Sequence, residues 1–487
     1  MADDELCYLT IAEAARLIRT RAIAPVDLVE AMLARIETHD GRVRAFLHVA
    51  GDQALPEART AGRAPAGGED RGPLHGVPIA IKDIVDVAAM PTTAGSRVLA
   101  GNVASEDAAL VAALRRAGAI IVGKTNTHEF AYGVITPPTR NPWDLTRIPG
   151  GSSGGSAAAL SAGMAYGAVG TDTAGSIRLP AALCGVVGLK PTYGRVSRRG
   201  IIPLSWSLDH AGPMARSVTD AALLLEAMVA GRDPRDPATA GTPLPNLRGP
   251  HASGEALRAD VRGLRVGVPR PYFYDGLEPS VAAVVEEALR VLASLGMELR
   301  EVALPGVELT FALGRAIQRP EASAYHRQRL REVPDLYGDE LRGDLELGEL
   351  FLATDYIHAQ RVRAELHTQW LEVMDQLDVL AMPTVPVGAP RSAGTPAQEG
   401  TTSGAVKGTL PHFPDVPAGK GRLLHNTYPA NLVGFPALSL PCGLTAEGLP
   451  VGLQLIGRPF DEATVLRAGH AYEAATAWHT MRPPLEG

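Results

Sequence analysis

The sequence predicts an α/β protein, because apolar patterns with helical spacing alternate with short apolar runs typical of strands along its 487 residues. Helical spacing from Glu106 to Ala117 leads directly into the strand pattern AIIVG at Ala119–Gly123. Beyond residue 263 the alternation returns as a strand, a long helix and a second strand. No internal repeat is evident, so a repeat architecture is not expected.

The N-terminal elements are marked by capping residues and apolar runs. Thr10 and Glu13 have the spacing of a capping box ahead of the helical segment AARLIRTR. A second helical pattern runs from about Pro25 to Thr38. The apolar run Val77–Ile81 predicts a buried strand, which Lys82 closes.

In the second half, Ser217 and Asp220 resemble a capping box at the start of the helix AALLLEAMVA. Residues 231–262, which begin with a Pro/Gly-rich stretch, and the polar residues 391–422 predict surface connections. The elements expected between them are a strand at Leu264–Val268, a helix at Val281–Gly296 and a strand at Met297–Val302.

Composition agrees with a soluble cytoplasmic enzyme. Apolar residues make up 46% of the chain, and the net charge of −7 provides no basic face for nucleic acid or membranes. Cys7, Cys184 and Cys442 are odd in number and scattered, which favours free thiols over a disulfide framework. Neither a signal peptide nor an uncharged apolar stretch of about 20 residues is evident. We expect no metal and no cofactor, since the known zinc-site and phosphate-loop patterns are absent.

Two serines in small-residue turns are the first candidates for chemistry. Ser152 lies in a glycine-rich turn at 150–155, and Ser176 lies in a second turn of small residues. Glycine permits backbone angles closed to other residues and leaves a hydroxyl uncovered. The helix-like and strand-like segments between the two turns argue against a flexible linker.

Lys82 is the candidate base that would activate these serines. Only five of the 46 Lys and Arg residues are lysines, so simple positive charge is a poor explanation for a lysine on an apolar strand. Burial can drive a lysine neutral, whereas an arginine stays charged. The alternative is a lysine whose ammonium reaches the surface from the end of the strand.

Together these segments resemble the amidase signature family, from about residue 9 to residue 480. The resemblance implies a single α/β/α domain over residues 1–487, built on a large mixed sheet, with 231–262 and 391–422 as insert-like loops. The matching motifs are GVPIAIKD around Lys82, GKTNTHEFAYG at 123–133, NPWD at 141–144, PGGSSGGSAAA around Ser152, GTDTAGSIRLPAALCGVVGLKPTYGRVS around Ser176, DHAGPMARSVTDAALLLEAM, NLVGFPALSLPCG and GLPVGLQLIGRPFDEATVLRAG.

The resemblance implies a Ser–cis-Ser–Lys triad of Ser176, Ser152 and Lys82. Ser176 would attack an amide carbonyl and form an acyl-enzyme. Ser152, preceded by a cis peptide bond, would pass protons between Ser176, the leaving nitrogen and Lys82, the base. The implied activity is hydrolysis of a small-molecule carboxylic amide to an acid plus ammonia or an amine.

An oxyanion hole is implied at the backbone N–H groups of Thr173, Ala174, Gly175 and Ser176. The helix-like segment SIRLPAALC follows, and free N–H groups at a helix start favour negative charge. The family often has Gly-Gly-Ser at this turn, whereas this chain has Ala174, which limits φ somewhat.

Substrate contacts are less well defined. The family match places Ala131 and Tyr132 near the acyl pocket, although Tyr132 is equally explained as a core residue. Residues 316–325 and 425–431 are expected to form other walls. Asp172 and Arg178 are expected to form a structural ion pair or cap, or to contact substrate. The sequence leaves open which amide is cleaved, whether esters or hydrazides are also cleaved, and whether the chain forms a homodimer.

Other serine chemistries fit poorly. Residues 151–155 match the G-x-S-x-G nucleophile elbow, but the four prolines in the preceding TPPTRNPWDLTRIPG rule out the strand that the elbow requires. Asp209 and His210 are sequence neighbours, poorly placed for one to orient the other. No lysine has a serine three residues before it, which removes the S-x-x-K arrangement.

Two alternatives remain within the resemblance. One is the glutaminase subunit of a glutamyl-tRNA amidotransferase, which holds glutamine with an arginine-bearing segment and an aspartate five residues before a Pro-Ala-Asn motif. Here the first region reads AIQRPEASAYHRQRL, and Leu424 stands five residues before Pro429. A free amino acid would then have unpaired charges, so a stand-alone amidase is favoured. The other is a non-catalytic binding protein, which the intact triad positions disfavour.

Overall fold

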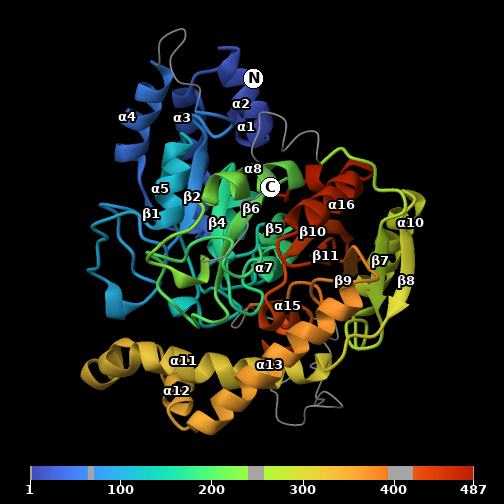
Figure 1. The fold of residues 1–487 in the computed structure, drawn as a ribbon. Coiled ribbons are helices and arrows are strands. Elements are labelled where there is room, and N and C mark those ends of the chain that lie inside the picture. Colours follow the sequence, from blue (N-terminus) through green and yellow to red (C-terminus); the bar gives the residue numbers. More distant parts are fainter. Residues whose placement is uncertain (1–2, 64–70, 240–256, 393–419, 486–487) are drawn as a thin grey trace, which may run out of the picture.

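The computed structural model describes residues 3–63, 71–239, 257–392 and 420–485. At its centre is one 11-stranded mixed sheet in the order β1-β3-β2-β4-β6-β5-β10-β11-β9-β7-β8. Helices surround this sheet, so the predicted α/β class is confirmed (Figure 1). The strands are β1 (Phe46–Val49), β2 (Pro78–Lys82), β3 (Ile120–Thr125), β4 (Gly167–Asp172), β5 (Val187–Lys190), β6 (His210–Ala215), β7 (Arg265–Pro269), β8 (Glu298–Val302), β9 (Val379–Pro383), β10 (Ala437–Leu444) and β11 (Pro450–Gly457).

Fifteen α-helices and six short 3₁₀ helices are assigned in the described residues. The α-helices are α1 (Asp3–Cys7), α2 (Ile11–Arg19), α3 (Pro25–Val43), α4 (Gly51–Gly62), α5 (Ala109–Arg116), α6 (Gly154–Ser161), α7 (Arg178–Cys184), α8 (Val218–Met228), α10 (Pro279–Ser294), α11 (Thr310–Glu332), α12 (Asp339–Gly348), α13 (Ala353–Met374), α14 (Lys420–Leu424), α15 (Tyr428–Val433) and α16 (Glu462–Ala474). The 3₁₀ helices are η1 (Arg97–Leu99), η2 (Glu129–Ala131), η3 (Pro237–Thr239), η4 (Val307–Leu309), η5 (Pro334–Leu336) and η6 (Trp478–Thr480).

The sheet has two covered faces, as the alternation along β2 shows. Ile79 and Ile81 belong to one buried cluster, which includes side chains of α5, α8 and α16. Ala80, between them, belongs to a second cluster with side chains of α4, α6 and α7. Successive strand residues point to opposite faces, so each face is packed against its own helices. A parallel strand buried on both sides has a continuous apolar sequence, which explains the run that predicted β2.

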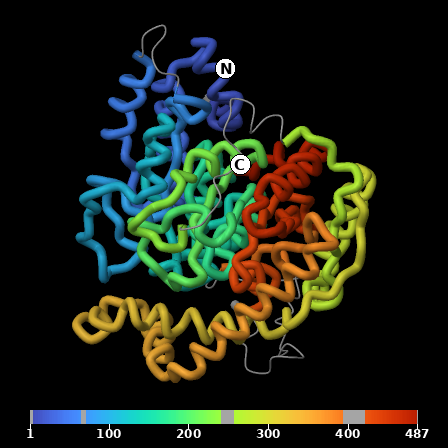
Figure 2. The backbone as a smooth tube through the Cα atoms, in the orientation of Figure 1, coloured from blue at the N-terminus to red at the C-terminus, as the bar shows by residue number. Residues whose placement is uncertain are grey.

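The chain does not build the sheet in sequence order. β10 returns from the C-terminal region to pair antiparallel with β5, with Ala437 opposite Lys190. In Figure 2, the red C-terminal segment therefore lies between the green middle of the chain and the yellow-green segment that comes next in the sequence after that middle part. This pairing brings residues 425–435 to the turn that follows β4.

Both predicted capping pairs are helix starts, but they differ in detail. At α2, Thr10 Oγ1 accepts from the Glu13 N–H and the Glu13 carboxylate accepts from the Thr10 N–H, which completes the capping box. At α8, Ser217 Oγ accepts from the Asp220 N–H. The Asp220 carboxylate does not turn back to Ser217 and instead accepts from the N–H of Ile11. The second pair is therefore half a capping box, because Asp220 satisfies the start of α2.

Large parts of the two predicted insert-like loops lie outside the described residues. Of 231–262, residues 231–239 and 257–262 are described, and η3 lies in the first of these parts. Of 391–422, residues 391–392 and 420–422 are described, and α14 begins at Lys420.

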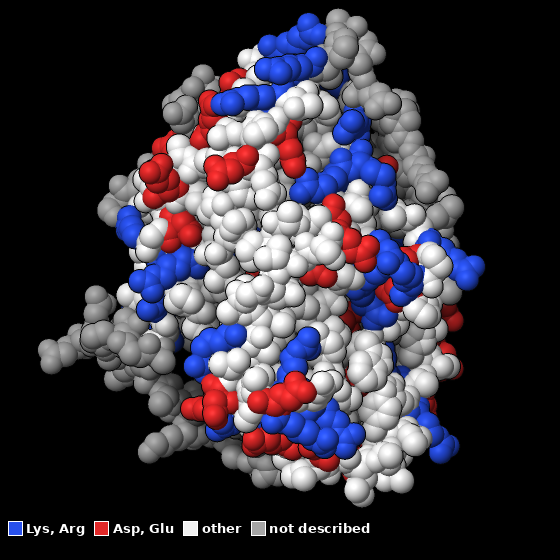
Figure 3. Space-filling model, turned by 90° about the vertical axis from the view of Figure 1, so that its left-hand side faces the viewer, with Lys and Arg blue, Asp and Glu red and all other residues white. Residues whose placement is uncertain are grey.

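The charged side chains on the face shown in Figure 3 are of both signs, with a band of uncharged residues between them. Among the described helices, none is both long and apolar enough to cross a membrane.

Candidate active site

Two parallel strands bring the first candidate groups together. β2 and β4 are neighbours in the sheet, with Ile81 opposite Val169. Lys82 is the last residue of β2, while Thr171 and Asp172 end β4. Because the carboxyl ends of parallel strands meet at one edge of a sheet, they commonly form ligand sites.

Lys82 is surrounded by hydroxyl groups. Its Nζ lies 2.7 Å from Ser152 Oγ, 2.9 Å from Ser153 Oγ and 2.8 Å from Thr171 Oγ1. The residue is 0% exposed, which excludes the alternative of an ammonium that reaches the surface. Burial lowers the pKa of Lys82 to about 7, although the carboxylates of Asp172 and Asp209 act in the opposite direction. A substantial fraction of the amine is therefore neutral near pH 7.

The turn that carries Ser152 is held by backbone hydrogen bonds. The Gly151–Ser152 peptide bond is cis. The Ser152 carbonyl accepts from the His128 N–H at 3.1 Å and from Thr136 Oγ1 at 3.2 Å. The turn opens directly into α6, and β3 ends well before it at Thr125. No strand leads into Ser152 in this described stretch, so the nucleophile-elbow interpretation is wrong.

Ser176 lies in a turn that contacts the first one. The Ser153 N–H donates to the Ser176 carbonyl at 3.2 Å, and Ser176 is 5% exposed. Gly175 has φ +139°, and a Cβ built there would lie 2.1 Å from Thr427 Oγ1. Only glycine therefore fits at this position. Within the described part of the chain, the N–H groups of residues 174–176 donate to no protein acceptor, so they are free to bind a developing negative charge.

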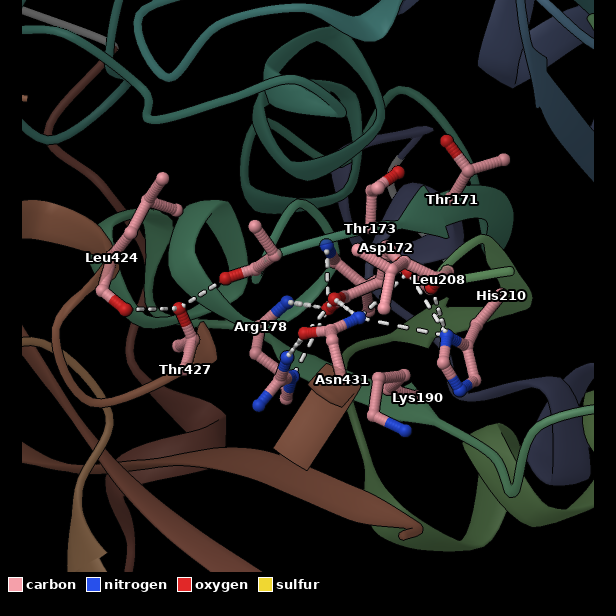
Figure 4. A network of polar contacts seen from close by, with 12 residues as sticks. Thr171, Asp172, Thr173, Arg178, Lys190, Leu208, His210, Leu424, Thr427 and Asn431 are labelled. Carbon is pink, nitrogen blue, oxygen red and sulfur yellow. Dashed lines mark hydrogen bonds and ion pairs between the residues drawn. The ribbon is translucent and has the colours of Figure 1, made fainter. Parts of the chain in front are cut away.

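Asp172 connects this turn to α7 and α15 (Figure 4). Its carboxylate accepts from the Arg178 guanidinium at 2.9 Å, from Asn431 Nδ2 at 2.8 Å and from the Ile177 N–H at 3.1 Å. Burial raises the pKa of the Asp172 carboxyl, but Arg178, Lys190 and Asn431 outweigh burial and hold it well below its usual range. Asp172 and Arg178 thus form an ion pair and a helix cap at once.

Asp209 supports the other side of the turn. Its Oδ1 accepts from Thr173 Oγ1 at 2.6 Å, and its Oδ2 accepts from the N–H groups of Leu204 and Ser205. Burial raises the pKa of Asp209 to about 6, while these hydrogen bonds act to lower it. His210 Nδ1 lies 2.7 Å from the Leu208 carbonyl, so Asp209 and His210 do not form a catalytic pair.

A cavity of about 190 Å³ adjoins these groups. Thr171, which contacts Lys82, lines it together with Thr173 and Ala131. Apolar side chains form much of the remaining wall, and Arg198, Arg199 and Arg235 in that wall each have an acidic partner. The apolar members are Ile84, Ile201, Ile202, Pro203, Leu204 and Trp206.

The residues predicted to contact substrate come from three separate segments of the chain. Ala131 lines the cavity and has φ +60°, an uncommon conformation for a residue with a side chain. Tyr132 is buried, and within the described residues its hydroxyl group donates to no acceptor. Residues 316–325 lie within α11 and residues 425–431 reach α15. Thr427 Oγ1 donates to the Ala174 carbonyl at 2.7 Å.

Sequence reasoning missed several groups that complete the arrangement. Ser153 and Thr171 contact Lys82, and Asp209 holds Thr173. The adjacency of Ser153 to Ser152 and the position of Thr171 at the end of an apolar run were available signals. Thr427, which covers Gly175, lies in the predicted wall 425–431, but its particular contact carries no local signal, because only the return of β10 brings it to this turn.

The whole-chain comparisons agree with this geometry. The family model described as Amidase matches residues 27–466. The chain belongs to the amidase family. It is 45% identical to an "Amidase" of Pseudomonas putida over 485 residues, which covers 99% of both proteins. It is also 44% identical to a glutamyl-tRNA(Gln) amidotransferase subunit of Chloroflexus aurantiacus over 509 residues, again 99% of each. A solved structure described as "Crystal structure of amidase" matches with a TM-score of 0.82 and 35% identity, covering 96% of this chain and 99% of that one.

These findings confirm the predicted family and the α/β sheet of an amidase. They also confirm an enzyme of the class that hydrolyses amide carbon–nitrogen bonds. Because the chain is similar both to amidases and to amidotransferase subunits, its substrate and the roles of individual residues have to be argued from the site.

Proposed function

We propose that this protein is a stand-alone amidohydrolase with Ser176 as nucleophile, Ser152 as proton bridge and Lys82 as base. The observation that carries the proposal is the environment of Lys82, a fully buried amine that contacts three hydroxyl groups and has its pKa lowered to about 7. A general base works best when its pKa is near the working pH.

In the first half-reaction, Ser176 Oγ attacks the amide carbon while its proton passes to Ser152 Oγ. The proton of Ser152 passes at the same time to the neutral amine of Lys82. The carbonyl oxygen becomes an oxyanion held by N–H groups from the turn Thr173, Ala174, Gly175 and Ser176. When the C–N bond breaks, the leaving nitrogen takes a proton from Ser152, and Lys82 returns a proton to Ser152. Ammonia or an amine leaves, and the acyl group stays on Ser176.

In the second half-reaction, water replaces the amine. Ser152 takes a proton from water and passes its own to Lys82 as the oxygen attacks the acyl carbon. The bond to Ser176 Oγ then breaks, and the proton returns through Ser152 to Ser176. The carboxylic acid leaves with one oxygen from water, and every side chain regains its starting protonation state.

Covalent labelling tests the nucleophile. A fluorophosphonate probe followed by digestion and mass spectrometry is expected to place one adduct on Ser176. Ser176→Ala is expected to lose both labelling and amide turnover, whereas Ser294→Ala, at the exposed C-terminal end of α10, keeps both. An adduct on Ser153, or full turnover by Ser176→Ala, would contradict the assignment.

A second candidate function is the glutaminase activity of an amidotransferase, which the 44% identity over 99% of the chain supports. Leu424 stands where the glutaminase subunit carries an aspartate that helps to hold glutamine, and without it the charges of a free amino acid would be unpaired. We therefore expect L-glutamine to be a poorer substrate than glutaramate, which lacks the ammonium. A preference for L-glutamine would favour this second candidate instead.

We further propose that residues 1–487 act as one domain in the cytoplasm. One sheet draws strands from Phe46 through Gly457, which supports a single domain. The three cysteines are free and buried, which is typical of a reducing compartment.

A further inference from the structure

One turn of α11 lies against the segment that covers the nucleophile turn. Thr427 Oγ1 donates to the Ala174 carbonyl, next to Gly175, and Tyr428 follows directly. The Tyr428 hydroxyl donates to Gln318 Oε1 at 2.8 Å. Gly314 lies so close to the Tyr428 ring that a Cβ there would be 1.9 Å from Cε1. Residues 314–319 of α11 therefore pack against Tyr428, whose neighbour Thr427 contacts the turn that carries Ser176.

The same part of α11 also contacts the segment that lines the cavity. The Arg315 guanidinium carbon lies 5.6 Å from the centre of the Tyr132 ring. Ala131, the neighbour of Tyr132, lines the cavity together with Thr171 and Thr173. Arg315 thus lies near two segments beside the proposed triad, 427–428 and 131–132. The second of these also lines the cavity through Ala131.

Positive charge exceeds negative charge in this cluster. Arg315 and Arg319 each place Nη2 3.0 Å from the same oxygen of Asp344 on α12. In the described part of the chain neither arginine has a second ion pair. Both arginine side chains are about one-quarter exposed or less, at 22% and 24%. These two partly buried guanidinium groups and the carboxylate that they share carry a net charge of +1. The nearby Glu321 carboxylate is held by the hydroxyl groups of Ser205, Ser207 and Tyr356 instead.

The cluster also contains donors without acceptors. The Tyr132 hydroxyl and Arg319 Nε are buried, and within the described residues neither donates to an acceptor, although Arg315 and Arg319 lie close to the phenol oxygen. Burial raises the pKa of the Tyr132 phenol and outweighs the two arginines, which act to lower it, so at neutral pH it carries a proton to donate. Buried donors without partners are costly. A ligand that brings acceptors and negative charge would satisfy them.

We propose that Arg315, Arg319 and Tyr132 form a subsite that binds a carboxylate carried by the amide substrate. A carboxylate accepts hydrogen bonds only, and guanidinium groups suit its planar geometry. The substrate class is then an amide with an acid group at its other end, such as the monoamide of a dicarboxylic acid. The subsite has no free carboxylate for a substrate ammonium, because both arginines already share Asp344. This inference rests on the proposed amidohydrolase function.

Paired substrates of equal chain length test the subsite. Succinamate, glutaramate and adipamate are compared with butanamide, pentanamide and hexanamide, in which a methyl group replaces the carboxylate. At least one acid amide is expected to have a kcat/KM about tenfold or more above its neutral partner, mainly through a lower KM. Arg315→Ala is expected to remove this preference and Arg315→Lys to keep part of it. Arg331→Ala, exposed on the same helix, keeps all of it.

The possible failures are distinguishable. Equal or better turnover of the neutral amides would overturn the carboxylate subsite while leaving the amidohydrolase proposal intact. An equal loss by Arg315→Ala on both substrate sets, with unchanged thermal unfolding, would also overturn it. Absence of turnover for all amides together with no probe adduct on Ser176 would remove the proposed function and the subsite with it.

Discussion

Lys82 Nζ lies 2.7 Å from Ser152 Oγ, and in the described part of the chain it forms no ion pair. Lys124 offers a direct contrast, because it is equally buried but has Asp83 3.2 Å away. A carboxylate partner stabilises the ammonium form, whereas hydroxyl groups also accommodate a neutral amine. Burial lowers the pKa of both lysines, but among the described residues only Lys124 has a carboxylate in contact, which fits a structural role for Lys124 and the proposed proton transfer for Lys82.

The pH dependence of kcat/KM is expected to have an acid limb near pH 7. The pKa of Lys82 is lowered to about 7, so the base is neutral above this pH and protonated below it. Activity therefore falls about tenfold per pH unit on the acid side. A stopped assay between pH 5 and pH 9, with thermal unfolding at each pH, checks this prediction. A rate that stays flat to about pH 5 would exclude Lys82 as the base.

Lys82→Arg is expected to be inactive, because arginine keeps the charge and cannot accept a proton at neutral pH. Lys124→Arg is the matched control, since it also places a larger cation at a fully buried position. The control keeps its partner Asp83 and is expected to retain turnover per folded molecule. Substantial activity in Lys82→Arg would contradict the proposed mechanism.

Asp209→Asn is expected to move the acid limb to lower pH. The Asp209 carboxylate raises the pKa of Lys82, so its removal favours the neutral amine. Asparagine can still accept from the N–H groups of Leu204 and Ser205, which keeps the loop in place. Asp236→Asn, on the same cavity wall, is the control. An unchanged acid limb in Asp209→Asn would mean that the two groups do not interact.

Gly175→Ala is expected to lower kcat by about a hundredfold or more, because it disrupts the oxyanion donors. The new Cβ would lie 2.1 Å from Thr427 Oγ1, at a φ of +139°. Gly448→Ala separates the two causes, since Gly448 also has positive φ but nothing within 4 Å of its Cβ position. Activity in Gly175→Ala close to that of Gly448→Ala would show that the turn tolerates the clash.

Arg178→Met is expected to reduce the free energy of unfolding by about 3–5 kcal/mol, because it leaves the Asp172 carboxylate buried and without its cation. Both side chains of this pair are 0% exposed. Denaturant unfolding measures the change. Arg262→Ala, which breaks an exposed pair with Asp260, is expected to cause no measurable loss. Similar effects of the two substitutions would contradict a structural role for Arg178.

Much of the site could be predicted because its chemistry is local in the sequence. Ser152 and Ser176 lie in small-residue turns, and Lys82 ends an apolar run. Parallel strands that are buried on both faces have continuous apolar sequences. The strand β2 and its terminal lysine could therefore be recognised without tertiary information.

The sequence by itself determined the α/β class, the capping of α2 and the family of the enzyme. Tertiary structure alone decided which groups surround those serines. Thr427 reaches Gly175 only because β10 pairs with β5, and Asp220 caps α2 across more than two hundred residues of chain. Likewise, Arg315 shares Asp344 because α11 and α12 fold against each other. Local patterns record which side chains an element buries, but contacts between distant segments depend on strand order and helix packing, which no local spacing encodes.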